Sequence, residues 1–179
     1  WIPIKPNTDG AMMAGMAHYI FTHNLQDQAF IDRFCMGMDA GTMPQWAPNS
    51  VNGQENFKDY ILGTYDGVPK TPEWQEKESA VPAKDVRALA REWGARKTYL
   101  APGGIVGFGS ACRCATGAEW ARSMVCLMAM QGLGKPGVNM GCLQQGTPVD
   151  SSFYFPGYSE GGLSGDLDGT AMGVNLYQR

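Results

Sequence analysis

The chain has 179 residues, of which 44% are hydrophobic and 17% charged, and its formal net charge is −3. The length predicts one domain with room for a proper core. The charged fraction is below the roughly 25% of typical globular proteins, which predicts a surface partly covered by a cofactor, a partner or the rest of a larger protein. The acidic balance without a basic stripe excludes nucleic acid as an expected partner, and no apolar run approaches the roughly 18 residues of a membrane span.

A short strand is predicted over residues 1–6, where the chain begins on "WIPI" without a Met or a signal peptide. We therefore interpret residues 1–179 as a single piece of a longer polypeptide. The next segment, 7–24, places methionines and Ile20 at helical spacing, and Thr8 or Asp9 is available to cap its first turn. These residues predict the first helix.

Further elements are predicted as far as residue 94. A second short helix is expected around 30–34, and a surface loop rich in Gly, Pro and Asn follows over 35–54. One or two helical turns end at Gly63, and the next segment, "GTYDGVPKTPEW", is typical of turns. A helix then begins at Pro82 and is stopped by Gly94.

The sequence "KTYLAPGG" predicts a buried strand that runs into a glycine-rich loop and then a helix over 117–131. That helix is apolar nearly all round, which predicts deep burial, and Thr116 with Glu119 three residues later predicts a capping box. A glycine-rich loop before a helix offers backbone N–H groups to an anion, and Arg113 adds a guanidinium for a phosphate or a heteroaromatic edge. The alternative is a tight turn without a ligand, since the spacing matches neither a P-loop nor the Rossmann fingerprint.

The stretch "DSSFYFPGYSEGGLSGD", residues 150–166, gathers four aromatic rings around a Pro-Gly pair. Neither a strand nor a helix accommodates this pattern, so we predict a loop. Its rings either close a core from outside or meet a ligand.

Five cysteines, odd in number and irregular in spacing, argue against a secreted disulfide scaffold. Cys112 and Cys114 are too close for the C-x-x-C spacing of zinc and iron–sulfur sites, and His18 and His23 are the only histidines. The sequence predicts reduced, mostly buried thiols and no metal site within this chain.

Several segments, in the same order, resemble the dimethyl sulfoxide reductase family of molybdopterin enzymes: "WIPIKPNTDGAM", "FKDYILGTYDGVPKTPEW", "AVPAKDVRALAREWG" and "GKPGVN". The resemblance covers nearly the whole chain. The segment from "TYLAPGG" to "GVNMG", together with "FYFPGYSEGGLSGD", resembles the transhydroxylase branch, which transfers hydroxyl groups between polyhydroxylated aromatics. A sulfoxide or oxyanion reductase of the same family is the alternative, and a non-catalytic structural or interaction domain is the alternative from another class.

The resemblance implies an α/β fold belonging to the domains that bind the molybdopterin dinucleotide, with short parallel strands and predominating helices. It implies two molybdopterin guanine dinucleotides around one molybdenum or tungsten in the full-length protein, with none required on this chain alone. The implied partners are a small-molecule substrate and an iron–sulfur electron-transfer small subunit. The implied location is cytoplasmic, or periplasmic for the reductase branch.

The resemblance also assigns site residues. In the family motif, the Thr–Asp end lies against guanosine, and Thr8 and Asp9 stand at the matching positions here. A carboxylate suits guanine because it accepts hydrogen bonds from the ring N–H and the exocyclic amine. Asn7 stands where the family usually has Gly. Tyr158 matches a tyrosine that reaches the substrate pocket, where a phenol can bind a substrate hydroxyl or shuttle a proton. The other cofactor contacts implied are Gly107, Gly109, Ser110, Arg113 and Asn139, whereas the metal ligand is expected outside this chain.

Overall fold

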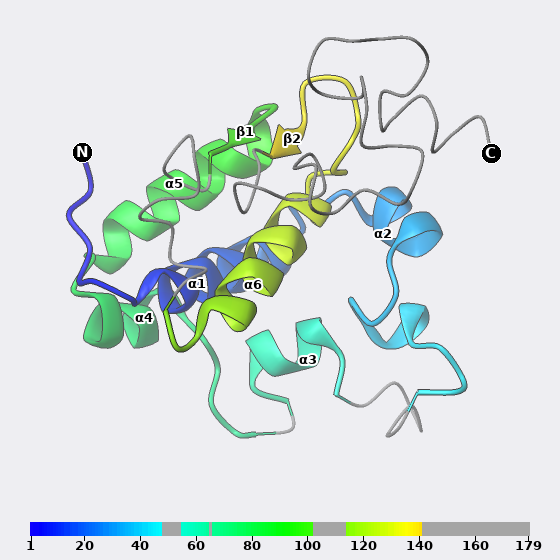
Figure 1. The fold of residues 1–179 in the computed structure, drawn as a ribbon, viewed down its shortest axis with the longest axis horizontal. Helices are drawn as coiled ribbons and strands as arrows, with labels where there is room; N and C mark the ends of the chain where they lie inside the picture. Colours follow the sequence, from blue (N-terminus) through cyan, green and yellow to red (C-terminus); the bar gives the residue numbers. More distant parts are fainter. Residues whose placement is uncertain (48–54, 65, 102–113, 141–179) are drawn as a thin grey trace, which may run out of the picture. The chain divides into compact units, whose positions relative to one another are not determined.

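Helix α1 (Asp9–Thr22) lies at the centre of the fold, and helices α3, α4, α5 and α6 all pack against it (Figure 1). The computed structural model describes residues 1–47, 55–64, 66–101 and 114–140. These residues belong to one compact unit of the chain. The remaining elements, in chain order, are α2 (Gln28–Phe34), the 3-10 helix η1 (Ala40–Thr42), α3 (Phe57–Leu62), α4 (Pro72–Ser79), α5 (Ala83–Ala95), β1 (Tyr99–Leu100), α6 (Gly117–Ala129) and β2 (Asn139–Met140).

The two short strands form a parallel pair, in which Tyr99 lies opposite Asn139 and Leu100 opposite Met140. Helices predominate in the described residues. The predicted α/β class, with short parallel strands and more helix than strand, is therefore confirmed.

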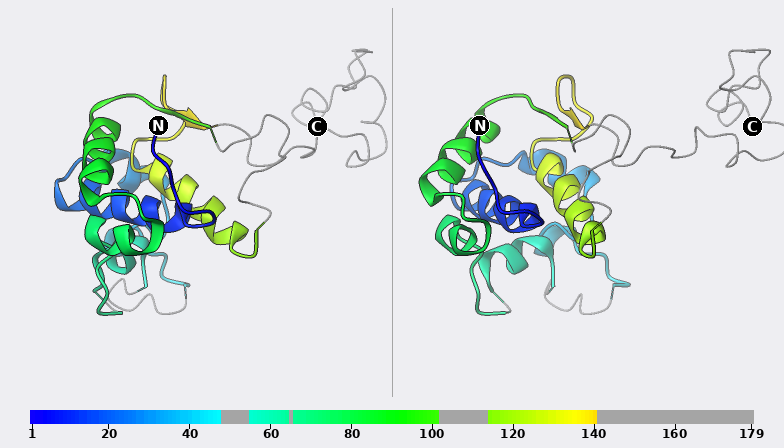
Figure 2. Two further views of the ribbon diagram at one scale, coloured as in Figure 1. Left: turned by 90° about the vertical axis from the view of Figure 1, so that its left-hand side faces the viewer. Right: turned by 60° about the vertical axis from the view of Figure 1, so that its left-hand side comes forward.

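The hydrophobic core forms around the C-terminal half of α1, where Met16 and Ile20 are buried. Helices α4 and α5 lie on one side of α1 and α6 on the other (Figure 2). The apolar face predicted for α5 is buried through Val86, Ala90 and Trp93. The predicted helical spacing of these segments is therefore confirmed, because the same positions supply the core.

The strand predicted over residues 1–6 is wrong. No regular element precedes α1, and the backbone N–H of Lys5 donates to the carbonyl of Ser79 at 3.0 Å. Pro3 and Pro6 have no N–H to give to a ladder, and a strand needs a neighbour with which to pair. The segment is held instead by the end of α4.

The predicted turn segment, residues 63–74, includes the first three residues of α4, and for these three residues the prediction is wrong. The Thr71 side chain accepts a hydrogen bond from the N–H of Trp74 at 3.1 Å, and Pro72 occupies the first turn. A threonine cap followed by proline is a typical helix start, so the signal was present in "KTPEW".

Gly94 does not stop α5, which continues to Ala95. A Cβ at Gly94 would lie 2.8 Å from the Cβ of Leu25, so glycine lets the segment after α1 approach α5 closely. Pro82 precedes the first helical residue by one position. The boundary was predicted correctly to within a residue, but the role of the glycine was not.

Two predictions of burial also need correction. Helix α6 buries one face, including Trp120, Met124 and Leu127, whereas Val125 on its outer face is 40% exposed. In β1, Tyr99 is 64% exposed. An apolar side chain alone does not show which face the rest of the fold covers.

Candidate functional site

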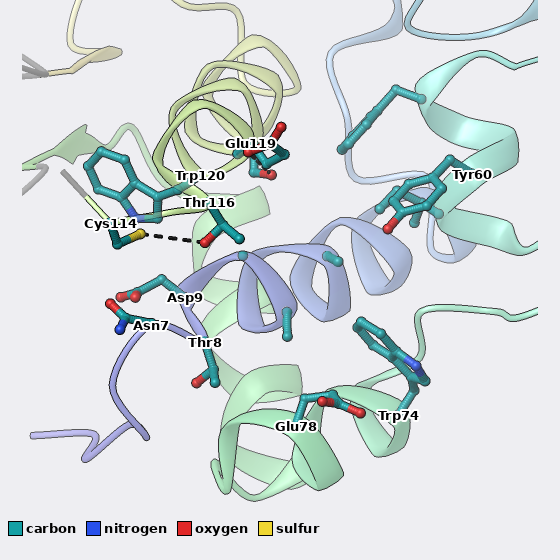
Figure 3. A pocket seen from close by; sticks show the side chains of 16 residues that line it. Asn7, Thr8, Asp9, Tyr60, Trp74, Glu78, Cys114, Thr116, Glu119 and Trp120 are labelled. Atoms are coloured by element: carbon teal, nitrogen blue, oxygen red, sulfur yellow. Dashed lines mark hydrogen bonds between the residues drawn. The ribbon is translucent and has the colours of Figure 1, made fainter. Parts of the chain in front are cut away.

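A pocket of about 320 Å³ lies where the first turns of α1 and α6 meet α3 and α4 (Figure 3). The small residues Gly10, Ala11 and Ala14 of α1 line it together with larger side chains of the surrounding elements. The other lining residues are Asn7, Thr8, Asp9, Phe57, Tyr60, Ile61, Trp74, Glu78, Cys114, Thr116, Glu119, Trp120 and Ser123. The pocket therefore contains Thr8 and Asp9, the two residues predicted to contact guanosine.

The turn before α1 leaves the start of this helix without a side-chain cap. Thr8 was predicted as one possible cap, but its hydroxyl donates to the carbonyl of Lys5 at 2.6 Å and makes no cap hydrogen bond. Asn7 has a φ of +65°, the left-handed region in which glycine is favoured and asparagine is tolerated. Asparagine is therefore compatible with the left-handed turn that precedes α1.

The first turn of α6 also has no side-chain cap, so the predicted capping box is not formed. The Thr116 hydroxyl lies 3.4 Å from the Cys114 sulfur, and the Glu119 side chain lines the pocket. Two uncapped helix starts consequently border the same space. The N–H groups of Ala11 and Gly117 donate to the carbonyls of Thr8 and Cys114, so it is the two helix dipoles that favour an acceptor atom there.

The charged side chains that line the pocket are all acidic: Asp9, Glu78 and Glu119. Within the described part of the chain, none of the three carboxylates has an ion pair or a side-chain hydrogen bond of its own. Four aromatic residues, Phe57, Tyr60, Trp74 and Trp120, share the lining. Flat rings and free carboxylates suit a heteroaromatic group with N–H donors, whereas the carboxylates would repel a phosphate.

Gly10 leaves free volume in the first turn of α1. A Cβ at this position would meet no atom within 4 Å. Internal packing therefore does not require glycine, and alanine would favour the helix. Open space at a residue that lines the pocket is consistent with a ligand that approaches the backbone closely.

No family model matches the chain. The chain is 46% identical over 179 residues to the pyrogallol hydroxytransferase large subunit of Pelobacter acidigallici; the match covers 100% of the chain and 19% of that protein. It is 50% identical over 98 residues to dimethyl sulfoxide reductase DmsA of Escherichia coli K12, covering 54% of the chain and 12% of the relative. It is 33% identical over 141 residues to trimethylamine-N-oxide reductase 1 of the same strain, covering 78% and 14%.

The chain belongs to the dimethyl sulfoxide reductase family. This is a family of molybdopterin oxidoreductases and hydroxytransferases, and membership implies a molybdenum cofactor built on molybdopterin. The chain spans between 12% and 19% of the length of these three relatives.

Among the other residues that the family resemblance assigned, Asn139 lies in β2 and does not line the pocket. Its side-chain oxygen accepts a hydrogen bond from the N–H of Met140 at 2.9 Å, and its own N–H donates to the carbonyl of Thr98 at 3.2 Å. The sites assigned to Gly107, Gly109, Ser110, Arg113 and Tyr158 lie outside the described residues.

Sequence reasoning missed several residues that complete the pocket of this family member. Tyr60, Trp74 and Glu78 come from α3 and α4 and had no site assigned to them, and Glu119 was assigned only to a cap. A partial signal lay in the segment from "FKDYILG" to "TPEW", which carries the family resemblance together with three pocket aromatics, Phe57, Tyr60 and Trp74. No periodic pattern in the sequence predicts that this segment lies beside Asp9 in the fold.

Cysteines and histidines do not build a metal centre in the described residues. No group of three or more His, Cys, Asp or Glu side chains there could hold a metal ion, and Cys35, Cys114 and Cys126 are free thiols. Burial raises the pKa of the Cys126 thiol to about 11, with a further contribution from Cys35. Among the same residues, no helix has the length and apolar character needed to cross a membrane.

Proposed function

We propose that this chain is part of the catalytic subunit of a molybdopterin-dependent hydroxytransferase acting on polyhydroxylated aromatics. The observation that carries this proposal is the 46% identity to the pyrogallol hydroxytransferase large subunit, because it extends over all 179 residues. The match to dimethyl sulfoxide reductase is limited to 98 residues. A polyphenol such as pyrogallol is accordingly the substrate class that we propose for the whole protein.

The pocket is proposed to hold the guanine end of a molybdopterin guanine dinucleotide. The Asp9 carboxylate has no partner among the described residues, so it can accept from the ring N–H and the exocyclic amine of guanine. The aromatic side chains can flank the base, and Gly10 leaves room for it. When bound, molybdenum or tungsten supplies the redox and oxygen-transfer chemistry.

The remaining assignments from the family resemblance stay proposals. We assign Gly107, Gly109, Ser110 and Arg113 to further contacts with the cofactor, in which the guanidinium suits a phosphate or a pterin edge. Asn139 would take part from β2, outside the pocket. Tyr158 is proposed to act on the substrate, either by binding a hydroxyl or by moving a proton.

The whole protein is also proposed to work with a partner. The relative from Pelobacter acidigallici is named as a large subunit, and a small subunit is therefore the partner that we propose here. We assign iron–sulfur electron transfer to that subunit and a cytoplasmic location to the complex, with a periplasmic one if the protein is a reductase.

Asp9→Ala in the full-length protein tests the cofactor assignment. Losing a charge-assisted hydrogen bond costs about 1.5–3 kcal/mol, so affinity for the molybdopterin cofactor should fall by roughly one to two powers of ten. Asp85→Ala is the matched control, because Asp85 also lies in the first turn of a helix but does not line the pocket. Equal molybdenum and pterin contents in both variants would mean that Asp9 does not bind the cofactor and interacts only with the dipole of α1.

A reductase of sulfoxides or amine oxides is the second candidate, favoured by the 50% and 33% identities to the two reductases. Assays of the full-length protein with a polyphenol and with dimethyl sulfoxide plus a reduced electron donor separate the two. Hydroxyl transfer between aromatics supports the first proposal. Steady sulfoxide reduction without hydroxyl transfer would replace it with the second.

A further inference from the structure

Lys70 is a buried cation beside the pocket. Its side chain is only 3% exposed, and its ammonium contacts the carboxylate of Asp66 and donates to the carbonyl of Val68 at 2.6 Å. The hydrogen bond from Lys70 is the main reason that the pKa of Asp66 lies below its usual value. Burying an ammonium without such partners would cost free energy of folding, so these contacts hold the Lys70 side chain in one position.

The same ammonium lies 4.2 Å from the centre of the Tyr60 ring. A lysine above an aromatic ring is attracted to the electron-rich face, more strongly where water is excluded. Tyr60 also lines the pocket and is 40% exposed. The ring thus contacts both the buried cation and the pocket.

The loop between α3 and α4 folds back tightly enough to keep Lys70 against this ring. The N–H of Lys70 donates to the carbonyl of Ile61 at 2.9 Å, and the N–H of Gly67 donates to that of Gly63 at 3.0 Å. Gly63 has a φ of +74°, and a Cβ there would lie 2.4 Å from the backbone nitrogen of Pro69. Only glycine permits the chain to reverse direction so tightly here. The reversal brings Lys70 against the ring of Tyr60 in the preceding helix.

We propose that Lys70 is a positioning residue for the pocket: its buried ammonium fixes the Tyr60 ring as the wall against which the ligand packs. This inference rests on the proposed function, because it takes the ligand to be the molybdopterin cofactor. The Lys70 side chain does not line the pocket, so its ammonium acts on the ligand through the Tyr60 ring.

A double-mutant cycle on the full-length holoenzyme separates positioning from simple loop stability. Lys70→Met removes the charge and keeps most of the stem, Tyr60→Ala removes the wall, and the rate at which purified protein loses its pterin is measured for each variant. We expect Lys70→Met to accelerate the loss by about 2- to 30-fold, the range that corresponds to a cation–π contact. In the Tyr60→Ala background the same substitution should have no further effect, whereas a merely structural role would give multiplicative effects.

Two further variants serve as a rescue and as a matched control. Lys70→Arg should restore pterin retention, since a guanidinium also stacks on an aromatic ring. Lys58→Met is the matched control, because Lys58 lies over the ring of Phe21, 5.6 Å from its centre, and neither residue lines the pocket. If Lys70→Met does not fold, Asp66→Asn, which loosens the ammonium without removing it, takes its place in the cycle.

The outcomes are distinct. Independent, multiplicative effects of the Lys70 and Tyr60 substitutions would overturn the inference and leave the proposed function intact. The same holds if Tyr60→Ala leaves pterin loss unchanged while Asp9→Ala accelerates it. If neither Tyr60→Ala nor Asp9→Ala changes pterin loss, the pocket does not hold the cofactor, and both proposals about it are wrong.

Discussion

The side chain of Gln75 lies directly over Gly15, at the contact between α4 and α1. A Cβ on Gly15 would be 2.5 Å from the Cγ of Gln75. Gln75 is fully buried, and its amide donates to the carbonyls of Pro72 and Val81 at 2.9 and 2.8 Å. The glutamine cannot move aside without losing buried hydrogen bonds, so α4 approaches α1 closely only because residue 15 has no side chain.

Gly15→Ala is therefore expected to destabilise the packing of α1 against α4 by about 1–3 kcal/mol, the usual cost of overpacking. Hydrogen exchange of the α1 and α4 amides in the full-length protein measures the effect as lost protection. Unchanged protection would mean that the glutamine can relocate.

Gly10→Ala in the same helix is expected to do the opposite. A Cβ there meets nothing within 4 Å, so the better helix propensity of alanine should maintain or raise protection of α1. The added methyl group occupies space beside the pocket, however, and pterin loss should accelerate. Stability and cofactor retention would thus change in opposite directions, and slower pterin loss would contradict the cofactor assignment.

Tyr158→Phe in the full-length enzyme tests the proposed substrate residue, since it removes only the hydroxyl. If the hydroxyl transfers a proton, turnover should fall by about 10²–10⁴-fold. If it only binds the substrate, KM should rise with kcat little changed. Steady-state kinetics with both constants unchanged would leave the ring as a packing group.

His18 should make the stability of α1 depend on pH. Burial, and secondarily the charge of His23, lower the pKa of His18 below 6.5. The unfolded chain then binds this proton more readily than the folded one, so stability is constant above pH 6.5 and decreases as pH falls towards the folded pKa. Hydrogen exchange of α1 between pH 5 and 7.5 should show this loss in the native protein and less of it in His18→Gln, whereas parallel profiles would exclude His18 as the cause.

Cys126 should resist alkylation. Burial raises its pKa from the ordinary 9.0 to about 11, which lowers the thiolate fraction at pH 8 by roughly 100-fold, and the thiolate is the reactive form. Mass spectrometry after timed iodoacetamide treatment measures the rate at each thiol, with denatured protein as the reference. Modification of Cys126 at the denatured rate would show that α6 opens readily.

Local signals in the sequence were sufficient for most of the helices and for the family. The methionines of α1 and the apolar face of α5 repeat at helical spacing, and Gly63 ends α3 in the left-handed conformation that glycine favours. The order of the long motifs predicted the family, and the match over all 179 residues of the chain confirms it. Each of these properties depends on neighbours along the chain.

Tertiary packing decided what the sequence alone could not. Among the described residues no strand lies beside residues 1–6, which do not form a strand, and glycine at position 94, inside α5, allows Leu25 to approach the helix closely. The pocket combines Asp9 with Tyr60 and Glu119, which are far apart in the chain, and no local pattern encodes their proximity. Local sequence patterns therefore determined most of the helices, whereas the packing of those helices on α1 determined which side chains share a pocket. Long-range contacts of this kind arise only when the helices meet.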